Sequence, residues 1–238
     1  SFLSFSQFVK AVGSMAAPYI STFFTVRYGD WRLTLLVFGV LSILSAVWLH
    51  FTKIEETKSK EQKATIGSCL KLMGVGYIAL MVLGIFFVVG IDVGVNAASG
   101  QFLLEKIGMD AEPAKQGRSL YFFGKMLGTF VGALLLIRFS AKKFMLVSAV
   151  ITLITIAALI FAPTPVFALS AMFLIGIGAA NLFPLIFSIT VDKYADRANE
   201  ISGLMIMAVS GGAFIPPLIG SVSDIMDITA GLYVLVFC

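Results

Sequence analysis

Polar side chains are few in this sequence, and two of them stand four residues apart in the apolar segment GIDVGVNAASGQ. The spacing places Asp92 and Asn96 on one face of a helix. A charged side chain at the centre of a membrane costs on the order of 2.5–3.5 kcal/mol, so such residues usually face a bundle interior. Because burial disfavours the charged form of a carboxyl group, Asp92 could bind and release a proton there. The alternative is that Asp92 pairs permanently with a lysine and only holds helices together.

A second polar pair stands in SFSQFVKAVGS, where Gln7 and Lys10 are three residues apart and share a helix face. The amide of Gln7 offers both a donor and an acceptor, which suits a sugar hydroxyl. Lys10 could pair with Asp92 or with a carboxylate elsewhere in a longer protein. Alternatively, its ammonium group could extend to the membrane interface.

Two further polar residues interrupt apolar sequence, Lys125 in FFGKMLG and Asn181 in GAANLFPLIF. Lys125 either lines a cavity or balances charge near the membrane boundary. Pro184 frees a backbone carbonyl close to Asn181, and irregular backbone at membrane depth is tolerated where it lines a cavity. Asn181 is therefore a candidate binding residue, with plain helix–helix hydrogen bonding as the alternative.

The sequence has no motif of the common enzymes. It contains no GxxxxGK[ST], HExxH or GxSxG, so it predicts neither an ATP-driven pump domain nor these hydrolases. Cys69, Cys238 and His50 have no other metal-type ligand at useful spacing, so neither a disulfide framework nor a metal site is predicted. We expect no catalytic residues and no cofactor.

The composition indicates that lipid surrounds the elements that position these residues. The 238 residues are 59% hydrophobic and 13% charged, whereas soluble domains are roughly 45–50% apolar and about 25% charged. The net charge of +4 comes from basic residues in short loops. No basic stripe with interleaved aromatic residues is present, so nucleic-acid binding is not predicted.

The apolar sequence divides into continuous segments of about 20 residues, the length that a membrane-crossing helix needs. Strands of a membrane barrel would alternate between apolar and polar residues instead. We predict an all-α, polytopic transmembrane helix bundle with about seven full spans and a truncated eighth, because both ends interrupt an apolar segment. The expected spans are 2–26, 31–51, 74–101, 118–139, 144–161, 166–191, 201–222 and 229–238.

The longest polar stretch, KIEETKSKEQKAT, predicts a linker at 53–66 between two groups of helices, 1–52 and 67–238. Alternate loops that include this linker hold more lysine and arginine than the others, which places the linker in the cytoplasm. Small residues in GKMLGTFVGAL, GIGAAN and SGGAF predict close helix packing. Pro216 and Pro217 predict a kink or break.

The sequence resembles the fucose–proton symporter branch of the major facilitator superfamily, which includes bacterial fucose and glucose/galactose permeases. The similar segments are IRFSAKK, NLFPLIFSI and SGGAFIPPLIGSVSD. They match the family pattern at Pro184, Ser188, Gly211, Gly212, Pro217, Gly220 and Asp224. VGIDVG resembles the start of the family's seventh helix, where related members have an acidic residue at the position of Asp92. Gln7 falls where the family has a sugar-site glutamine in its fifth helix.

The resemblance implies a twelve-helix bundle of which this chain supplies helices five to twelve. Residues 1–52 would be the last two helices of the N-terminal half, and 53–66 would be the cytoplasmic linker between the halves. Residues 67–238 would be the C-terminal half with a truncated last helix. The missing N-terminal half would be a partner in the central cavity, so we expect no transport by this chain alone.

The implied function is secondary transport in the bacterial inner membrane. The protein would import a monosaccharide, a hexose or 6-deoxyhexose such as fucose, glucose or galactose, together with a proton. The implied sugar contacts are Gln7, Asn96 and Asn181. The implied proton-coupling or intramembrane charges are Asp92, Lys10 and Lys125.

Two departures from the family pattern affect these roles. Lys10 replaces a neutral polar residue, which would alter substrate choice, and Gly128-Thr129 stands where the family often has Gly-Arg. One alternative function is a facilitator-type exporter of drugs or metabolites. Another, of a different class, is a non-transporting membrane sensor or scaffold with the same fold.

Overall fold

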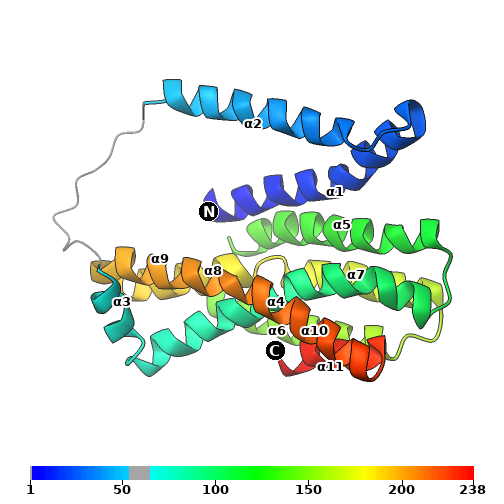
Figure 1. Ribbon diagram of the computed structural model, residues 1–238. Helices are drawn as coiled ribbons and strands as arrows, with labels where there is room; N and C mark the ends of the chain where they lie inside the picture. The colour runs from blue at the N-terminus through cyan, green and yellow to red at the C-terminus, as the bar shows by residue number, and fades with distance from the viewer. Residues whose placement is uncertain (1, 54–64) are drawn as a thin grey trace.

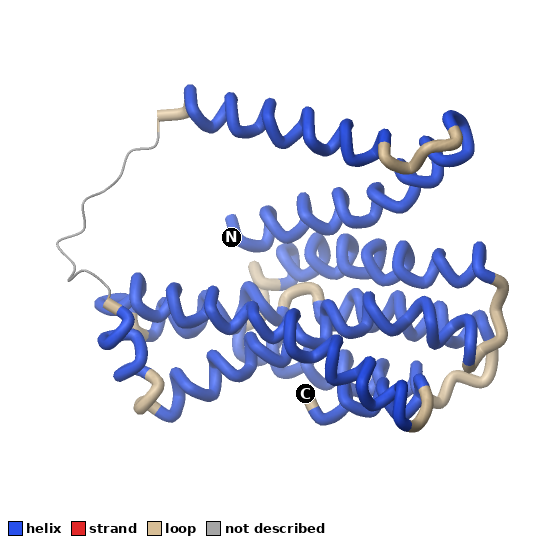
Figure 2. The backbone as a smooth tube through the Cα atoms, viewed as in Figure 1, coloured by secondary structure: helices blue, strands red, loops and turns tan. Residues whose placement is uncertain are grey.

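The computed structural model describes the backbone of residues 2–53 and 65–238, with side chains described throughout these ranges except at 2–8, 11, 15, 18, 112 and 115. All regular structure in these ranges is helical, and Figure 2 contains no strand there. The predicted all-α class is therefore confirmed. Most of the predicted linker, 54–64, lies outside the described residues, so the domain boundaries stay predictions.

The helices follow one another with short connections. They are α1 (Phe2–Tyr28), α2 (Leu33–Phe51), α3 (Ile66–Leu72), α4 (Gly76–Glu105), α5 (Ala111–Leu135), α6 (Ala141–Ile160), α7 (Pro165–Ala179), α8 (Leu182–Lys193), η1 (Ala195–Arg197), α9 (Ala198–Met207), η2 (Ala208–Ser210), α10 (Gly211–Ile225) and α11 (Ile228–Phe237).

Five segments of the described chain are long and apolar enough to cross a membrane. They are Leu33–Phe51, Gly76–Glu105, Ala141–Ile160, Pro165–Lys193 and Ala195–Ile225. Each overlaps a span that the sequence predicts, as a multi-pass membrane protein requires. The total number of spans stays a prediction.

The helices pack as a bundle in which α5 lies against α7, α7 against α6, and α4 against α10. Helix α1 packs along α5, and α2 lies beyond α1 at the edge of the bundle (Figure 1). Only 6% of the apolar stretch of α2 is buried. An apolar helix with so little contact needs lipid or further protein to cover it.

Two groups of buried apolar side chains hold the bundle together. Phe102 of α4, Tyr121 of α5 and Met172 of α7 belong to the first group. The second group includes Leu72 of α3 and Ile201 of α9, with several residues from the first half of α4. The short helix α3 is thereby anchored to the bundle through apolar contacts.

Glycines allow α5 and α7 to approach until their backbones touch. A Cβ atom at Gly124 would clash with the carbonyl oxygen of Phe173, and one at Gly176 would clash with the carbonyl oxygen of Tyr121. The close packing predicted from the small-residue clusters is confirmed at these positions. The approach sets the position of the α5 face that carries Lys125.

The predicted span 166–191 is divided between α7 and α8. Pro184 is the third residue of α8, where its missing N–H would have no intrahelical partner. The irregular backbone therefore lies just before it, at Ala180 and Asn181. In contrast, α10 continues through Pro216 and Pro217, and the irregular turn η2 precedes that helix.

Candidate functional site

Asp92 of α4 and Lys125 of α5 form an ion pair inside the bundle. Lys125 Nζ lies 2.6 Å from Asp92 Oδ1, and the side chains of Lys125 and Asp92 are 9% and 19% exposed. The partners are 33 residues apart in the chain, so helix packing creates the pair. The sequence allowed a lysine partner for Asp92, and in the structure this partner is Lys125.

Tyr121 completes the surroundings of the Asp92 carboxylate. Its hydroxyl group donates to Oδ1, the same oxygen that accepts from Lys125. Its side chain is fully buried. Tyr121 lies four residues before Lys125, so both side chains leave α5 on the same face. Tyr121 was not predicted from the sequence, because YFFG reads as ordinary apolar helix, although its spacing to Lys125 places both residues on one helix face.

The other carboxylate oxygen, Oδ2, has no hydrogen-bond partner among the described residues. A cavity of about 150 Å³ adjoins Asp92, Lys125 and Lys10, which is several times the roughly 30 Å³ that a water molecule occupies in the liquid. The remaining lining residues are apolar, namely Val88, Val89, Ala179, Ala180, Phe183 and Val209. Apolar walls with a few convergent polar groups are typical of small-molecule sites.

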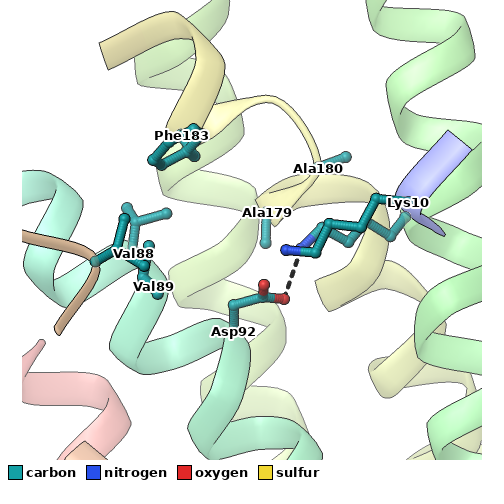
Figure 3. Close-up of a pocket in the computed structure, with 9 residues that line it drawn as sticks. Lys10, Val88, Val89, Asp92, Ala179, Ala180 and Phe183 are labelled. Carbon is teal, nitrogen blue, oxygen red and sulfur yellow. Dashed lines mark hydrogen bonds and ion pairs between the residues drawn. The ribbon is translucent and has the colours of Figure 1, made fainter. Parts of the chain in front are cut away.

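Lys10 reaches this cavity from α1. Figure 3 shows Lys10 and Asp92 facing the same space, with Val88, Val89 and Phe183 on its apolar side. No carboxylate oxygen of the described residues lies within 4.0 Å of Lys10 Nζ. The direct ion pair of Asp92 is thus with Lys125, and the ammonium charge of Lys10 acts on the Asp92 carboxylate from a greater distance.

Gln7 lies one turn before Lys10 in α1, but its side chain lies outside the described residues. A sugar contact by Gln7 stays a prediction.

Asn96 lies one turn after Asp92, but its side chain turns back along α4. Its Nδ2 donates to the carbonyl oxygen of Asp92 at 2.6 Å. Its Oδ1 is buried and has no hydrogen-bond partner in the part of the chain described. Asn96 is not among the residues that line the cavity, so its contact with a substrate stays a prediction.

Asn181 lies in the break between α7 and α8 and is 2% exposed. Its Nδ2 donates to the carbonyl oxygen of Gly128 at 2.7 Å. This bond between helices is the alternative that the sequence offered. The preceding residues Ala179 and Ala180 line the cavity instead, and contact of Asn181 with a sugar stays a prediction.

The polar centre consists of one carboxylate, two ammonium groups and a tyrosine hydroxyl. These groups can hydrogen-bond the hydroxyls of a substrate, attract an anion and exchange a proton. Within 2–53 and 65–238, no group of three or more His, Cys, Asp and Glu residues could hold a metal ion.

The comparison with known families identifies the type of bundle. The sequence profile of the Major Facilitator Superfamily matches residues 1–217. The chain belongs to this superfamily. The resemblance stated from the sequence is confirmed, and the five membrane-length segments are those of a multi-pass membrane protein of the major-facilitator type.

Curated relatives of this major facilitator chain are bacterial. A Helicobacter pylori protein, provisionally named a glucose/galactose transporter, is 30% identical over 198 residues, which are 83% of this chain and 48% of the relative. The Brucella abortus glucose/galactose transporter is 25% identical over 215 residues, which are 90% of this chain and 51% of the relative. The chain therefore spans about half the length of the curated relatives it matches.

Solved structures have the same fold. The Escherichia coli fucose:proton symporter matches with a TM-score of 0.70 at 22% identity, over 87% of this chain and 53% of that chain. A structure described as the outward conformation of a major facilitator transporter matches with a TM-score of 0.69 at 21% identity. At these identities the likeness establishes the fold.

Proposed function

We propose that this chain is part of a secondary transporter of the bacterial inner membrane that imports a monosaccharide together with a proton. The observation that carries the proposal is a carboxylate held by a lysine at a cavity between membrane helices of a major facilitator protein. The names of its relatives support a sugar substrate, and the name of the matched Escherichia coli structure supports proton coupling. The substrate would bind near the bilayer midplane and face each side of the membrane in turn.

Sugar binding would use the acceptors and donors at the cavity. Asp92 Oδ2 can accept from a sugar hydroxyl while Oδ1 stays with Lys125 and Tyr121. Gln7 and Asn96 would add amide groups, and Asn96 would first have to turn its amide away from the backbone of α4. Asn181 would contact the sugar only after its bond to Gly128 opens, so we expect its contribution to vary between transport states.

Proton coupling would depend on competition for the Asp92 carboxylate. A proton on this group removes the negative charge that holds Lys125. Lys125 would then be a buried cation without a partner, which is unfavourable. Protonation therefore favours a different arrangement of α4 and α5, and a coupled carrier requires such a bias between two states.

The proposed domain organisation follows the family pattern. Residues 1–52 would belong to the N-terminal half, 53–66 would form the cytoplasmic linker, and 67–238 would belong to the C-terminal half. Lys10 of the first half and Asp92 of the second line one cavity, which supports a binding site between the halves.

The test uses the complete protein in proteoliposomes that contain a pH-sensitive dye. A panel of monosaccharides is added outside, and acidification of the interior is recorded. The proposal predicts that at least one sugar causes proton entry. If no sugar does so in folded protein, the symporter proposal fails. Drug movement would then favour the exporter, and binding without movement would favour the sensor.

A further inference from the structure

The side chain of Asn181 ties the break between α7 and α8 to α5. Asn181 is 2% exposed, and its Nδ2 donates to the carbonyl oxygen of Gly128 at 2.7 Å. Gly132, one turn further along α5, leaves room for this amide, because a Cβ atom at that position would clash with Asn181 Nδ2. Both bonded groups are buried within this chain, and a buried hydrogen bond of this kind opposes the sliding and rotation of one helix on another.

The bond acts on α5 one turn from Lys125. Gly128 follows Lys125 by three residues, so the two lie on the same face of the helix. On the other side of Lys125, α7 touches the backbone of α5. A Cβ atom at Gly176 would clash with the carbonyl oxygen of Tyr121 and would come close to the backbone nitrogen of Lys125. The turn of α5 that carries Lys125 is therefore held from both sides by the segment that contains α7 and α8.

The same segment also packs against the helix that carries Asp92. Helix α7 lies along α5, whereas α8 lies against α4, and α8 shares a buried apolar group with the first half of α4. The break between α7 and α8 is thus the point at which the chain passes from one helix of the ion pair to the other. Figure 3 shows Ala179 and Ala180 of this region at the same cavity as Asp92.

We propose that Asn181 is a positioning residue for proton coupling, which fixes the break to α5 and so holds Lys125 at the Asp92 carboxylate. This role belongs to the state in which the bond to Gly128 is closed, and it requires no contact with the sugar. Without the amide, α5 can shift relative to α4, and the position of Lys125 no longer depends on the proton on Asp92. The inference rests on the proposed function and adds a residue to its coupling step.

Two variants disturb the amide of Asn181 in different ways. Asn181→Ala removes the donor, whereas Gly132→Ala keeps the donor and displaces it with an added methyl group. The double variant has room for that methyl group, so it should behave like Asn181→Ala alone. Gly203→Ala in α9 is the control, because nothing lies within 4 Å of its added Cβ atom.

The first measurement is the ratio of protons to sugar molecules that enter proteoliposomes of the complete protein, with labelled sugar and a pH-sensitive dye. We expect both single variants to lower this ratio by about twofold or more, because the loss of one buried hydrogen bond shifts an equilibrium by roughly fivefold. The apparent KM for the sugar should change by less than about twofold, since no substrate contact is removed. The Gly203→Ala control should keep the wild-type ratio.

A raised KM with an unchanged ratio would overturn the inference and would make Asn181 a sugar contact instead. Wild-type values of both quantities in Asn181→Ala would overturn it as well. If wild type itself shows no sugar-dependent proton entry, the proposed symport fails, and the link between Asn181 and Lys125 is then decided by a measurement that needs no transport.

That measurement is a double-mutant cycle on the complete protein in detergent. The unfolding temperature is recorded for Lys125→Met, for Asn181→Ala and for both changes together. The effects of independent sites add, whereas those of coupled sites do not. If Asn181 holds Lys125 in its pair, Asn181→Ala should lower the unfolding temperature by less in the Lys125→Met background than in wild type. Equal shifts in the two backgrounds would overturn the inference.

Discussion

Two ion pairs of this chain have the same length in different surroundings. The closest nitrogen and oxygen atoms are 2.6 Å apart both in Lys125–Asp92 and in Arg197–Glu200. Arg197 and Glu200 are three residues apart, and their side chains are 45% and 9% exposed. Lys125 and Asp92 lie on different helices and are 9% and 19% exposed. The distance between the charged atoms therefore does not rank the pairs, whereas the exposure of the cation and the separation along the chain do.

The comparison separates a local structural contact from a property of the whole bundle. Arg197 donates to Glu200 through both Nε and Nη2, at 2.6 and 3.0 Å, and this geometry requires only one turn at the start of α9. The Lys125–Asp92 pair requires the correct placement of α4 against α5. A substitution that disturbs the packing of α4 against α5 should therefore disrupt the Lys125–Asp92 pair and leave the Arg197–Glu200 pair intact.

The largest expected effect comes from Lys125→Met. This change leaves the Asp92 carboxylate buried without its cation, at a cost on the order of 3–5 kcal/mol in stability. We expect a large fall in unfolding temperature in detergent and loss of sugar uptake. The double variant Lys125→Met with Asp92→Asn should recover much of the stability, because no unpaired charge is left. Equal stability of the single and double variants would contradict the account.

Tyr121→Phe should have the next largest effect. It removes the hydroxyl that donates to Asp92 and keeps the ring that packs in the core. Hydrogen bonds to charged groups contribute about 1.5–3 kcal/mol, so uptake should fall by roughly tenfold or more. Initial uptake rates at several sugar concentrations measure the loss. Wild-type kinetics would mean that Lys125 alone positions the carboxylate.

Gly176→Ala tests the dependence of the pair on helix packing. The added methyl group would clash with the Tyr121 carbonyl oxygen, and overpacking typically costs about 1–3 kcal/mol. Gly203→Ala is the matched control in α9, because nothing lies within 4 Å of its added Cβ atom. Thermal unfolding should distinguish the two variants. A similar unfolding temperature for both would show that α5 and α7 can separate freely.

The smallest effect is expected for Arg197→Gln. The Arg197 side chain is 45% exposed, so water already solvates the cation of this pair, whereas the Glu200 side chain is 9% exposed. Sugar uptake should change by less than about twofold, and the unfolding temperature should fall by less than it does for Lys125→Met. A loss as large as that of Lys125→Met would invalidate the ranking of the two pairs by the exposure of their cations.

Hydropathy predicted where the helices lie, but it did not predict where a helix with polar first turns begins. The predicted span 118–139 begins well after the start of α5 at Ala111, because the first turns of that helix are polar and give no membrane signal. The break at Asn181 followed from Pro184, a local effect on the backbone. Pro216 and Pro217 predicted a kink or break, whereas α10 is assigned as one continuous helix through both prolines and the 3-10 turn η2 lies before its start.

The candidate site was predictable as a set of polar residues but not as a set of contacts. Asp92 stood out because an acidic residue is rare in apolar sequence, and a lysine partner was an expected alternative. The choice of Lys125 over Lys10 depends on how α5 and α1 are rotated, which one sequence does not specify. Tyr121 escaped notice because its hydroxyl acquires a role only where α4 and α5 meet.

The most direct test of the central claim is sugar-dependent proton entry in complete protein with Asp92→Asn. The asparagine keeps the size of the side chain and can still accept a hydrogen bond from Tyr121. Sugar exchange without a proton gradient is measured in the same vesicles to establish that the variant is folded and binds sugar. The account predicts that exchange persists while proton entry is lost. Proton entry at the wild-type rate would contradict it and would reduce the Asp92–Lys125 pair to a structural contact.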